Sequence, residues 1–382
     1  MTLLSTISIA ISLVLPLVTA AQTRPQIPTN RGVKPKPPIV RLGNAPDWSV
    51  VFHPDSSRVF IGTYQKVVAY SVVDGQKQGE WPLGVEGVRA LSFQANGEIL
   101  AIGSGVPGLS GSITLLDVAS GQTLRTIKPH TDTIEALAFS GDIVLSASDD
   151  ETVVLTDIKT GKQLGILSEH IGRCLSIAVP LRITDGSGGA IFATGGADKM
   201  IKIWDANARR VVVNFDQAQC SVWSLTSLSQ PGRFMAGCDD GSVRLFQVRA
   251  DTPNLGNDDN TLAPLTGAPA AAPIVALKPG QIAARTGSQT TVLTGHSAAV
   301  YSVAASANGN YMASGGADNK VIVWNRNGDK LREHAEATGD VWSVAISPNS
   351  RWLAAASVDG STRVYDLTDG TLLQTLPRGK IK

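Results

Sequence analysis

The chain has 382 residues, a formal net charge of +1 and 38 glycines. Because a nearly neutral chain offers no strongly basic patch, the composition argues against a nucleic-acid partner. The abundance of Val, Ile, Thr, Ser and Gly, with few charged residues, is typical of short strands joined by tight turns.

The N-terminus carries an apolar run, residues 3–18, that contains Pro16 and is followed by small residues. This pattern predicts a signal peptide over residues 1–21, and hence a secreted or periplasmic protein, although no Lys or Arg precedes the run. The alternative is a membrane anchor through residues 3–21, but the run is short for a span. No later stretch is long and apolar enough to cross a membrane, so we expect no membrane span in the mature chain.

Residues 22–43 form a basic, proline-rich segment that contains no acidic residue. Such a segment cannot bury a core, so we expect an extended tail. A second, short tail is expected over residues 378–382. The folded domain is therefore predicted to cover residues 44–377.

One short pattern recurs along this domain: an aspartate stands six residues before a Trp, or before the residue that replaces the Trp. The clearest copies are Asp198 with Trp204 and Asp318 with Trp324. Variant copies contain Asp150, Asp240 and Asp359. Two stretches before these copies keep the strand pattern but lack the aspartate. The spacing of about 42 residues, with one longer interval, predicts seven repeats.

Each repeat contains four short apolar runs separated by turn residues. Residues 341–376 show this clearly, with turns around Pro348, Gly360 and Gly370. Period-two runs bounded by Asn, Asp, Gly and Pro are typical of antiparallel strands joined by hairpins. Four strands in about 42 residues correspond to one blade of a propeller. The sequence therefore predicts an all-β, seven-bladed β-propeller with four antiparallel strands per blade.

The segments IKIWDAN (201–207), TGHSAAVYSVA (294–304) and SDDETVVLTD (148–157) resemble the WD-repeat β-propeller family. The resemblance implies that a His, a hydroxyl residue, an Asp and a Trp form a structural tetrad of hydrogen bonds within a repeat. The fourth and sixth repeats contain complete sets, namely His170, Thr194, Asp198 and Trp204, and His296, Ser314, Asp318 and Trp324.

Three other repeats depart from this pattern. The third repeat has Thr156 in place of the Trp, and the fifth and seventh have Ala236 and Ala355 in place of the hydroxyl residue. Because a buried polar network stabilises a fold only when its members are paired, we expect incomplete networks in these three repeats.

The polar residues of the repeats do not indicate a catalytic site. Three of the five histidines belong to tetrads or their variants, and no two histidines have metal-ligand spacing. The repeated aspartates share one hairpin offset, which is typical of turn residues. We therefore expect no catalytic residue, no metal and no cofactor, and predict that the chain is not an enzyme. The alternative is a propeller enzyme that binds a substrate or cofactor in its channel.

Two parts of the chain are irregular. In the fifth repeat, the fourth strand is expected at residues 290–296, so an insertion of about 250–288 separates it from the third strand. This insertion is rich in Ala, Pro and Gly and is predicted to be a long flexible loop. Residues 38–42 and 371–376 compete for the outermost strand of the last blade, and we favour the second segment.

The chain contains three cysteines. An exported protein can form disulfides, and Cys220 and Cys238 are expected on one blade. The sequence leaves open whether any two of Cys174, Cys220 and Cys238 are bonded, because it cannot show how closely their Cβ atoms approach.

Most repeats open their first strand with the pattern apolar-X-small-apolar, as in VWSV and VYSV. In the family that these repeats resemble, residue X lies at the rim of the central channel. Reading the seven repeats in order selects Trp48, Arg89, Glu135, Arg173, Trp223, Tyr301 and Trp342.

The four aromatic residues of this set belong to neighbouring blades, and Trp, Tyr and Arg often anchor interfaces. We therefore predict a monomeric, non-enzymatic scaffold that binds a protein or peptide partner at the channel mouth. The partner should place apolar side chains over the aromatic rings and an acidic group near Arg89 or Arg173. The alternative is that the rings only fill the channel.

Overall fold

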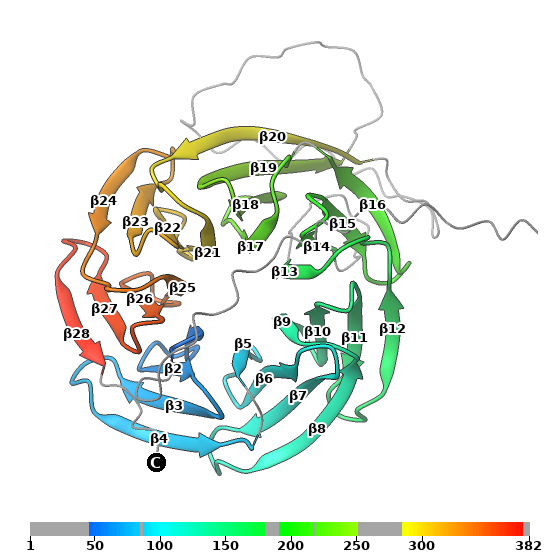
Figure 1. Cartoon of the computed structure of the whole chain (residues 1–382), viewed down its shortest axis with the longest axis horizontal. Coiled ribbons are helices and arrows are strands. Elements are labelled where there is room, and N and C mark those ends of the chain that lie inside the picture. Colours follow the sequence, from blue (N-terminus) through cyan, green and yellow to red (C-terminus); the bar gives the residue numbers. More distant parts are fainter. Residues whose placement is uncertain (1–45, 85–86, 180–190, 217, 251–284, 377–382) are drawn as a thin grey trace, which may run out of the picture.

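The computed structural model describes residues 46–84, 87–179, 191–216, 218–250 and 285–376. Within these residues, 28 strands form seven four-stranded antiparallel sheets, arranged as blades around a central axis (Figure 1). The predicted seven-bladed propeller is therefore confirmed. The predicted signal peptide (1–21), both predicted tails (22–43 and 378–382) and most of the insertion lie outside the described residues.

Each blade contributes one strand to each of four concentric layers (Figure 1). The innermost strands are β1 (Ser49–Phe52), β5 (Val88–Phe93), β9 (Ile134–Ser140), β13 (Cys174–Ala178), β17 (Val222–Ser227), β21 (Val300–Ala305) and β25 (Val341–Ile346). The second strands are β2 (Arg58–Gly62), β6 (Ile99–Val106), β10 (Ile143–Ser148), β14 (Ile191–Gly196), β18 (Arg233–Cys238), β22 (Tyr311–Gly316) and β26 (Trp352–Ser357).

The two outer layers complete the blades. The third strands are β3 (Lys66–Ser71), β7 (Ser110–Asp117), β11 (Val153–Asp157), β15 (Ile201–Asp205), β19 (Ser242–Ala250), β23 (Val321–Asn325) and β27 (Thr362–Asp366). The outermost strands are β4 (Lys77–Pro82), β8 (Thr123–His130), β12 (Gln163–Leu167), β16 (Arg210–Phe215), β20 (Arg285–Thr294), β24 (Lys330–His334) and β28 (Leu372–Leu376).

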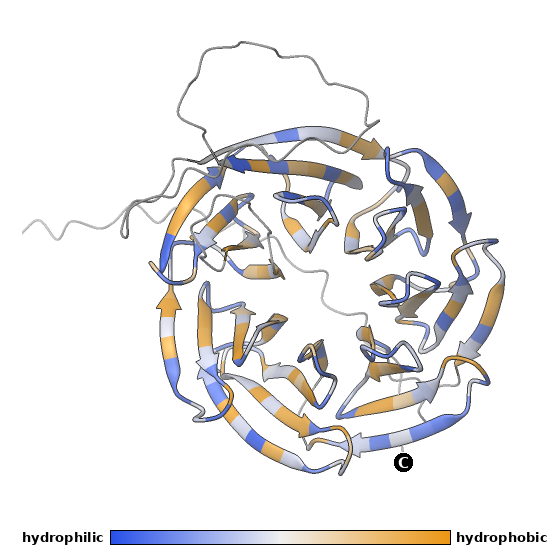
Figure 2. Cartoon of the chain, turned by 180° about the vertical axis from the view of Figure 1, so that it is seen from behind, coloured by the Kyte–Doolittle hydropathy of each residue, from blue (hydrophilic) through white to orange (hydrophobic). Residues whose placement is uncertain are grey.

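The apolar core lies between neighbouring blades and is densest along their middle strands. Every residue of β14 and β15 is buried, whereas β4 and β8 expose most of their residues. Hydrophilic residues accordingly gather in the turns and along much of the outermost layer (Figure 2). Each blade therefore stabilises the fold mainly through the two blades that it contacts.

Near the axis, the second strand of one blade closely approaches the innermost strand of the next. A Cβ placed on Gly195 of β14 would lie only 2.5 Å from Cγ1 of Val222 in β17. Glycines occupy the equivalent position in four further blades, namely Gly62, Gly103, Gly237 and Gly315. Blade three has Ala147 at this position, and the facing residue is Cys174, which is smaller than the Val or Ile that begins the innermost strand of blades two, three, five, six and seven.

Serine hydroxyls connect neighbouring innermost strands at the same level. Each accepts a hydrogen bond from a backbone N–H of the next blade: Ser224 from Val303 (3.1 Å), Ser302 from Val344 (3.0 Å) and Ser343 from Val50 (3.1 Å). These serines are the small residues of the apolar-X-small-apolar pattern. Small side chains are therefore required there by the narrow space between blades.

The ring closes where blade seven meets blade one. Strand β28 completes blade seven, as favoured from the sequence, and residues 38–42 lie outside the described part of the chain. An apolar cluster that includes Val50, Phe52 and Ala354 spans the junction. The buried Thr362 hydroxyl also donates to Asp47 Oδ2 at 2.8 Å. Among the described residues, closure depends on packing and hydrogen bonds between two complete blades.

Two details of blade five differ from the sequence interpretation or extend it. Strand β20 begins at Arg285 instead of Thr290, because β19 continues to Ala250 and keeps pairing with it. Residues 251–284 then connect the two strands. Cys220 and Cys238, whose pairing was left open, form a disulfide within this blade.

We predict that Gly195→Ala lowers the free energy of unfolding by about 1–3 kcal/mol, because the added methyl group overlaps Val222. Denaturant titration of the purified chain measures this loss. Combining it with Val222→Ala removes the overlapping branch, so the double variant should lose less stability than the two single losses added together. Strictly additive losses would contradict the proposed contact.

Candidate functional site: the mouth of the central channel

Near the start of each innermost strand, one residue lines the mouth of the channel. In six blades, pairing with the second strand shifts register around one extra residue, a β-bulge, and these residues are Arg89, Glu135, Leu175, Trp223, Tyr301 and Trp342. In blade one, the corresponding residue is Trp48, which lies just before β1. Its N–H donates to the carbonyl of Gly62 at 2.9 Å, and Gly62 is also the residue that pairs with Ser49. A bulge redirects the side chain in those six blades, and together with Trp48 these side chains line one pocket of about 60 Å³.

Six of the seven residues selected from the sequence line this pocket, but Arg173 does not. In blade four the bulge residue is Leu175, because Cys174 occupies the buried position that Val or Ile occupies in other blades. The sequence interpretation took Cys174 as the small residue of the pattern and was therefore two positions too early. The Arg173 Nε–H instead donates to Asp149 Oδ1 at 2.8 Å, so its charge is already paired.

The aromatic residues of the mouth pack against one another. The rings of Trp223 and Tyr301 meet edge to face with centroids 5.2 Å apart, and those of Tyr301 and Trp342 stack at 4.5 Å. As a result, Tyr301 is only 6% exposed and Trp342 only 8% exposed. Trp48 and Trp223 are partly buried. These four aromatic residues, Trp223, Tyr301, Trp342 and Trp48 in ring order, form an aromatic arc. This arc is less open than the sequence interpretation assumed, and its more accessible ends are Trp48 and Trp223.

Arg89 packs against two neighbouring rings of the mouth, those of Trp48 and Trp342. Its guanidinium lies 4.4 Å from the ring centroid of Trp48 and 6.0 Å from that of Trp342, which are cation–π distances. The Arg89 Nη1 and Trp48 Nε1 atoms are buried and have no hydrogen-bond partner among the described residues. Both are donors, so the pocket presents two buried donor groups that an acceptor could satisfy.

Tyr301 adds a hydroxyl that stays protonated. Burial, reinforced by the negative charge of Asp340, raises the pKa of Tyr301 to about 12. The pocket also contains one carboxylate, that of Glu135. The mouth therefore offers aromatic faces, several hydrogen-bond donors and a single acid, which suits recognition better than proton transfer between two titrating groups.

The hydrogen-bonded tetrads frame the same face. In blade four, Trp204 Nε1 donates to Thr194 Oγ1 (2.7 Å), which lies 2.8 Å from His170 Nε2, while His170 Nδ1 lies 2.7 Å from Asp198 Oδ2. Since a carboxylate only accepts, His170 must carry its proton on Nδ1. Blade six contains the same contacts, at 2.8 to 2.9 Å, between His296, Ser314, Asp318 and Trp324.

The pKa of Asp198 reflects this network. Burial acts to raise the pKa, but the hydrogen bonds from His170 and from two backbone N–H groups hold it below its ordinary value. The carboxylate therefore stays ionised at neutral pH, although its side chain is only 1% exposed.

The other tetrads are incomplete in the expected places. In blade three, His130 contacts Ser146 and Asp150, but Thr156 Oγ1 is buried with no hydrogen-bond partner in the described part of the chain. In blades five and seven an arginine four residues after the aspartate takes the place of the histidine, through the pairs Arg244–Asp240 (2.5 Å) and Arg363–Asp359 (3.0 Å). The sequence interpretation missed both arginines, although the spacing Asp-Gly-Ser-X-Arg occurs in both repeats.

One group of described residues has the spacing of metal ligands: Cys220, Cys238 and Asp240 offer atoms within 4.8 Å of one another. The two sulfurs are bonded to each other, so the carboxylate of Asp240 is the one group here that could act as an ordinary metal ligand. In the part of the chain that the structure describes, no helix is long and apolar enough to cross a membrane.

These features define a seven-bladed β-propeller whose channel mouth is lined by one side chain from each blade. Five stretches of the chain match the family described as WD domain, G-beta repeat: residues 121–157, 161–205, 210–247, 287–325 and 328–366. The chain belongs to this WD-repeat family. Blade one and the three inner strands of blade two lie before the first matched stretch, and these two blades lack the turn aspartate.

Several curated proteins are similar to part of the chain. The guanine nucleotide-binding protein subunit beta of Saccharomyces cerevisiae is 26% identical over 204 residues, which cover 52% of this chain and 47% of that protein. The corresponding subunit of Solanum tuberosum is 24% identical over 220 residues, covering 53% and 55%. Pre-mRNA-processing factor 19 of Bos taurus is 32% identical over 106 residues, covering 27% and 20%. The chain spans about half the length of the beta subunits that it matches.

We predict that Asp198→Ala lowers the free energy of unfolding by about 1–3 kcal/mol, because it leaves buried donors without an acceptor. Asp240→Ala should cost less, since its carboxylate is 42% exposed and already meets solvent. Chemical denaturation of both variants measures the difference. Equal shifts of the two midpoints would contradict the structural role given to the complete tetrad.

Proposed function

We propose that this protein is a non-enzymatic scaffold that works as a monomeric disc and binds a peptide segment of another protein at the channel mouth. The observation that carries this proposal is the convergence of one side chain from every blade on a single pocket. Four of these side chains are Trp or Tyr and one is Arg, which are the residue types that most often dominate binding energy. Similarity to subunits of larger assemblies supports the same conclusion.

The contacts within the mouth narrow the chemistry of the partner. Arg173 is paired with Asp149, so it has little attraction left for an acidic group. Arg89 Nη1 and Trp48 Nε1 remain without acceptors among the described residues. An Asp or Glu side chain of the partner would supply those acceptors, with apolar neighbours over Trp48 and Trp223. The enzyme alternative has no specific observation in its favour.

We predict that Trp223→Ala weakens partner capture by about 2 kcal/mol or more, because it removes an accessible ring and the edge contact to Tyr301. Trp342→Ala should also weaken capture, since it removes the ring that stacks on Tyr301 and lies under Arg89. Titrated pull-downs from the native compartment measure the loss.

The matched control is Val73→Ala. Val73 is 78% exposed and lies in the turn between β3 and β4, which is at the opposite end of the blade from the mouth. Its substitution should leave capture unchanged. Capture at wild-type strength by both tryptophan variants would move the binding surface away from the channel mouth.

We also propose that the protein is exported, with residues 1–21 removed and residues 22–43 left as a basic tail. The apolar run that ends in small residues supports this proposal, and the Cys220–Cys238 disulfide suits an oxidising compartment. N-terminal sequencing of the protein from the exported fraction should find Gln22 first. Recovery of an intact Met1 in a membrane pellet would instead support an anchor through residues 3–21.

A further inference from the structure

A second cavity lies between blades three and four, away from the channel mouth. It is lined by Ser140 at the end of β9 and by Ile143 at the start of β10, whereas the mouth residue Glu135 lies at the start of β9. The cavity is therefore at the opposite face of the ring. Its volume of about 280 Å³ is close to the lower limit of about 300 Å³ that is typical of small-molecule sites.

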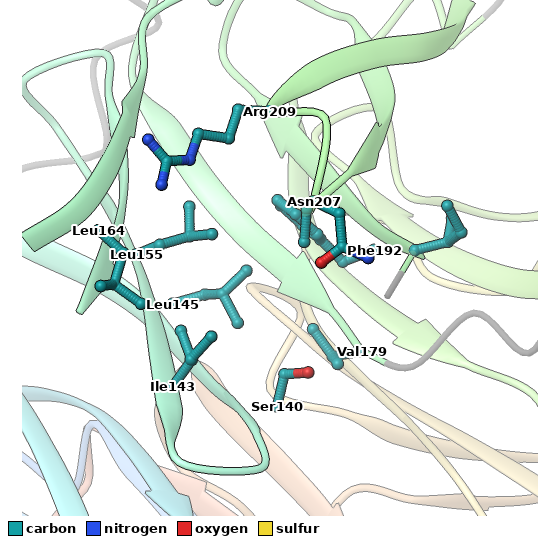
Figure 3. A pocket seen from close by; sticks show the side chains of 11 residues that line it. Ser140, Ile143, Leu145, Leu155, Leu164, Val179, Phe192, Asn207 and Arg209 are labelled. Carbon is teal, nitrogen blue, oxygen red and sulfur yellow. The ribbon is translucent and has the colours of Figure 1, made fainter. Parts of the chain in front are cut away.

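The cavity is lined mainly by aliphatic side chains at this blade junction, together with Phe192. Leu145, Leu155 and Leu164 project from blade three toward Phe192 and Val179 of blade four (Figure 3). The next junction is filled differently, by three mutually packed rings of Phe215, Phe234 and Phe246 with centroids 5.2 to 5.6 Å apart. The wall of the cavity is accordingly apolar.

A cation lies at one end of this apolar cavity. The side chain of Arg209 extends across the gap from the turn between β15 and β16, next to Asn207 (Figure 3). Gly165 of β12 permits this position, because a Cβ there would lie 3.1 Å from Arg209 Cδ. Arg209 is exposed and makes no hydrogen bond or ion pair with any described residue.

The backbone of Arg209 shows that the arginine is unusual at this position. The equivalent turn in five other blades has a glycine with positive φ, namely Gly75, Gly121, Gly161, Gly328 and Gly370. Arg209 adopts φ 51° in the same left-handed region, which disfavours residues with a Cβ. Blade four therefore keeps a strained residue where glycine would relieve the strain, and strain of this kind concentrates at binding sites.

We propose that this pocket between blades three and four binds a small carboxylate with an apolar body. The carboxylate pairs with the Arg209 guanidinium and accepts a hydrogen bond from the Asn207 amide. The hydrocarbon part fills the space between Leu155 and Phe192, where it is removed from water. A neutral ligand of the same shape gains only the apolar contacts, and a cationic ligand is repelled by Arg209.

Isothermal titration with octanoate, octan-1-ol and octylamine tests this assignment on the full chain. We expect the order octanoate, octan-1-ol, octylamine, from tightest to weakest. Arg209→Gly should reduce octanoate affinity at least about tenfold and leave octan-1-ol binding unchanged. This variant should fold well, because its turn then resembles the five that contain glycine.

Leu164→Phe fills the cavity and should remove binding of both octanoate and octan-1-ol. NMR shifts of the Leu145 and Leu155 methyl groups on adding octanoate to the wild-type chain locate the site without any substitution. The proposal is overturned if octanoate does not bind, if it binds no tighter than octan-1-ol, or if Arg209→Gly retains full octanoate affinity. Saturable octanoate binding without shifts at those methyl groups would also overturn it.

Discussion

The narrow space around the propeller axis is the constraint on which the rest of the structure depends. Seven innermost strands converge there, and each must pass the second strand of its neighbour at close range. Gly195 against Val222, and Ala147 against Cys174, show how the sizes of facing side chains are matched. Serine hydroxyls such as that of Ser343 use the remaining space to connect one blade to the next.

The same crowding shapes the channel mouth, which we propose as the binding surface. A bulge at the start of the innermost strand places an extra residue beside the small one, and this residue can only point into the channel. The innermost strands and the ring contacts leave little rotameric freedom to the side chains of Trp223, Tyr301 and Trp342. A partner that binds such a preorganised surface loses less entropy than one that must first order mobile loops.

The blades could be predicted from the sequence because turn residues and period-two runs are local signals that recur seven times. Most residues of the channel mouth could be predicted from the sequence for the same reason. Leu175 was missed because a pattern of letters does not show whether Cys174 stands for a small or a branched residue, and only the pairing with Gly196 decides this. Arg209 and its cavity could not be predicted, since the empty volume results from side chains on two separate blades.

The central claim is that the bulge residues of the channel mouth form the partner-binding surface. It is tested most directly by photocrosslinking, with a photoreactive phenylalanine analogue at position 223 and, in a second variant, at position 73. We expect a covalent conjugate with one partner from position 223, with the crosslinked segment containing an acidic residue, and none from position 73. Crosslinking from position 73 alone, or equally from both positions, would contradict the account.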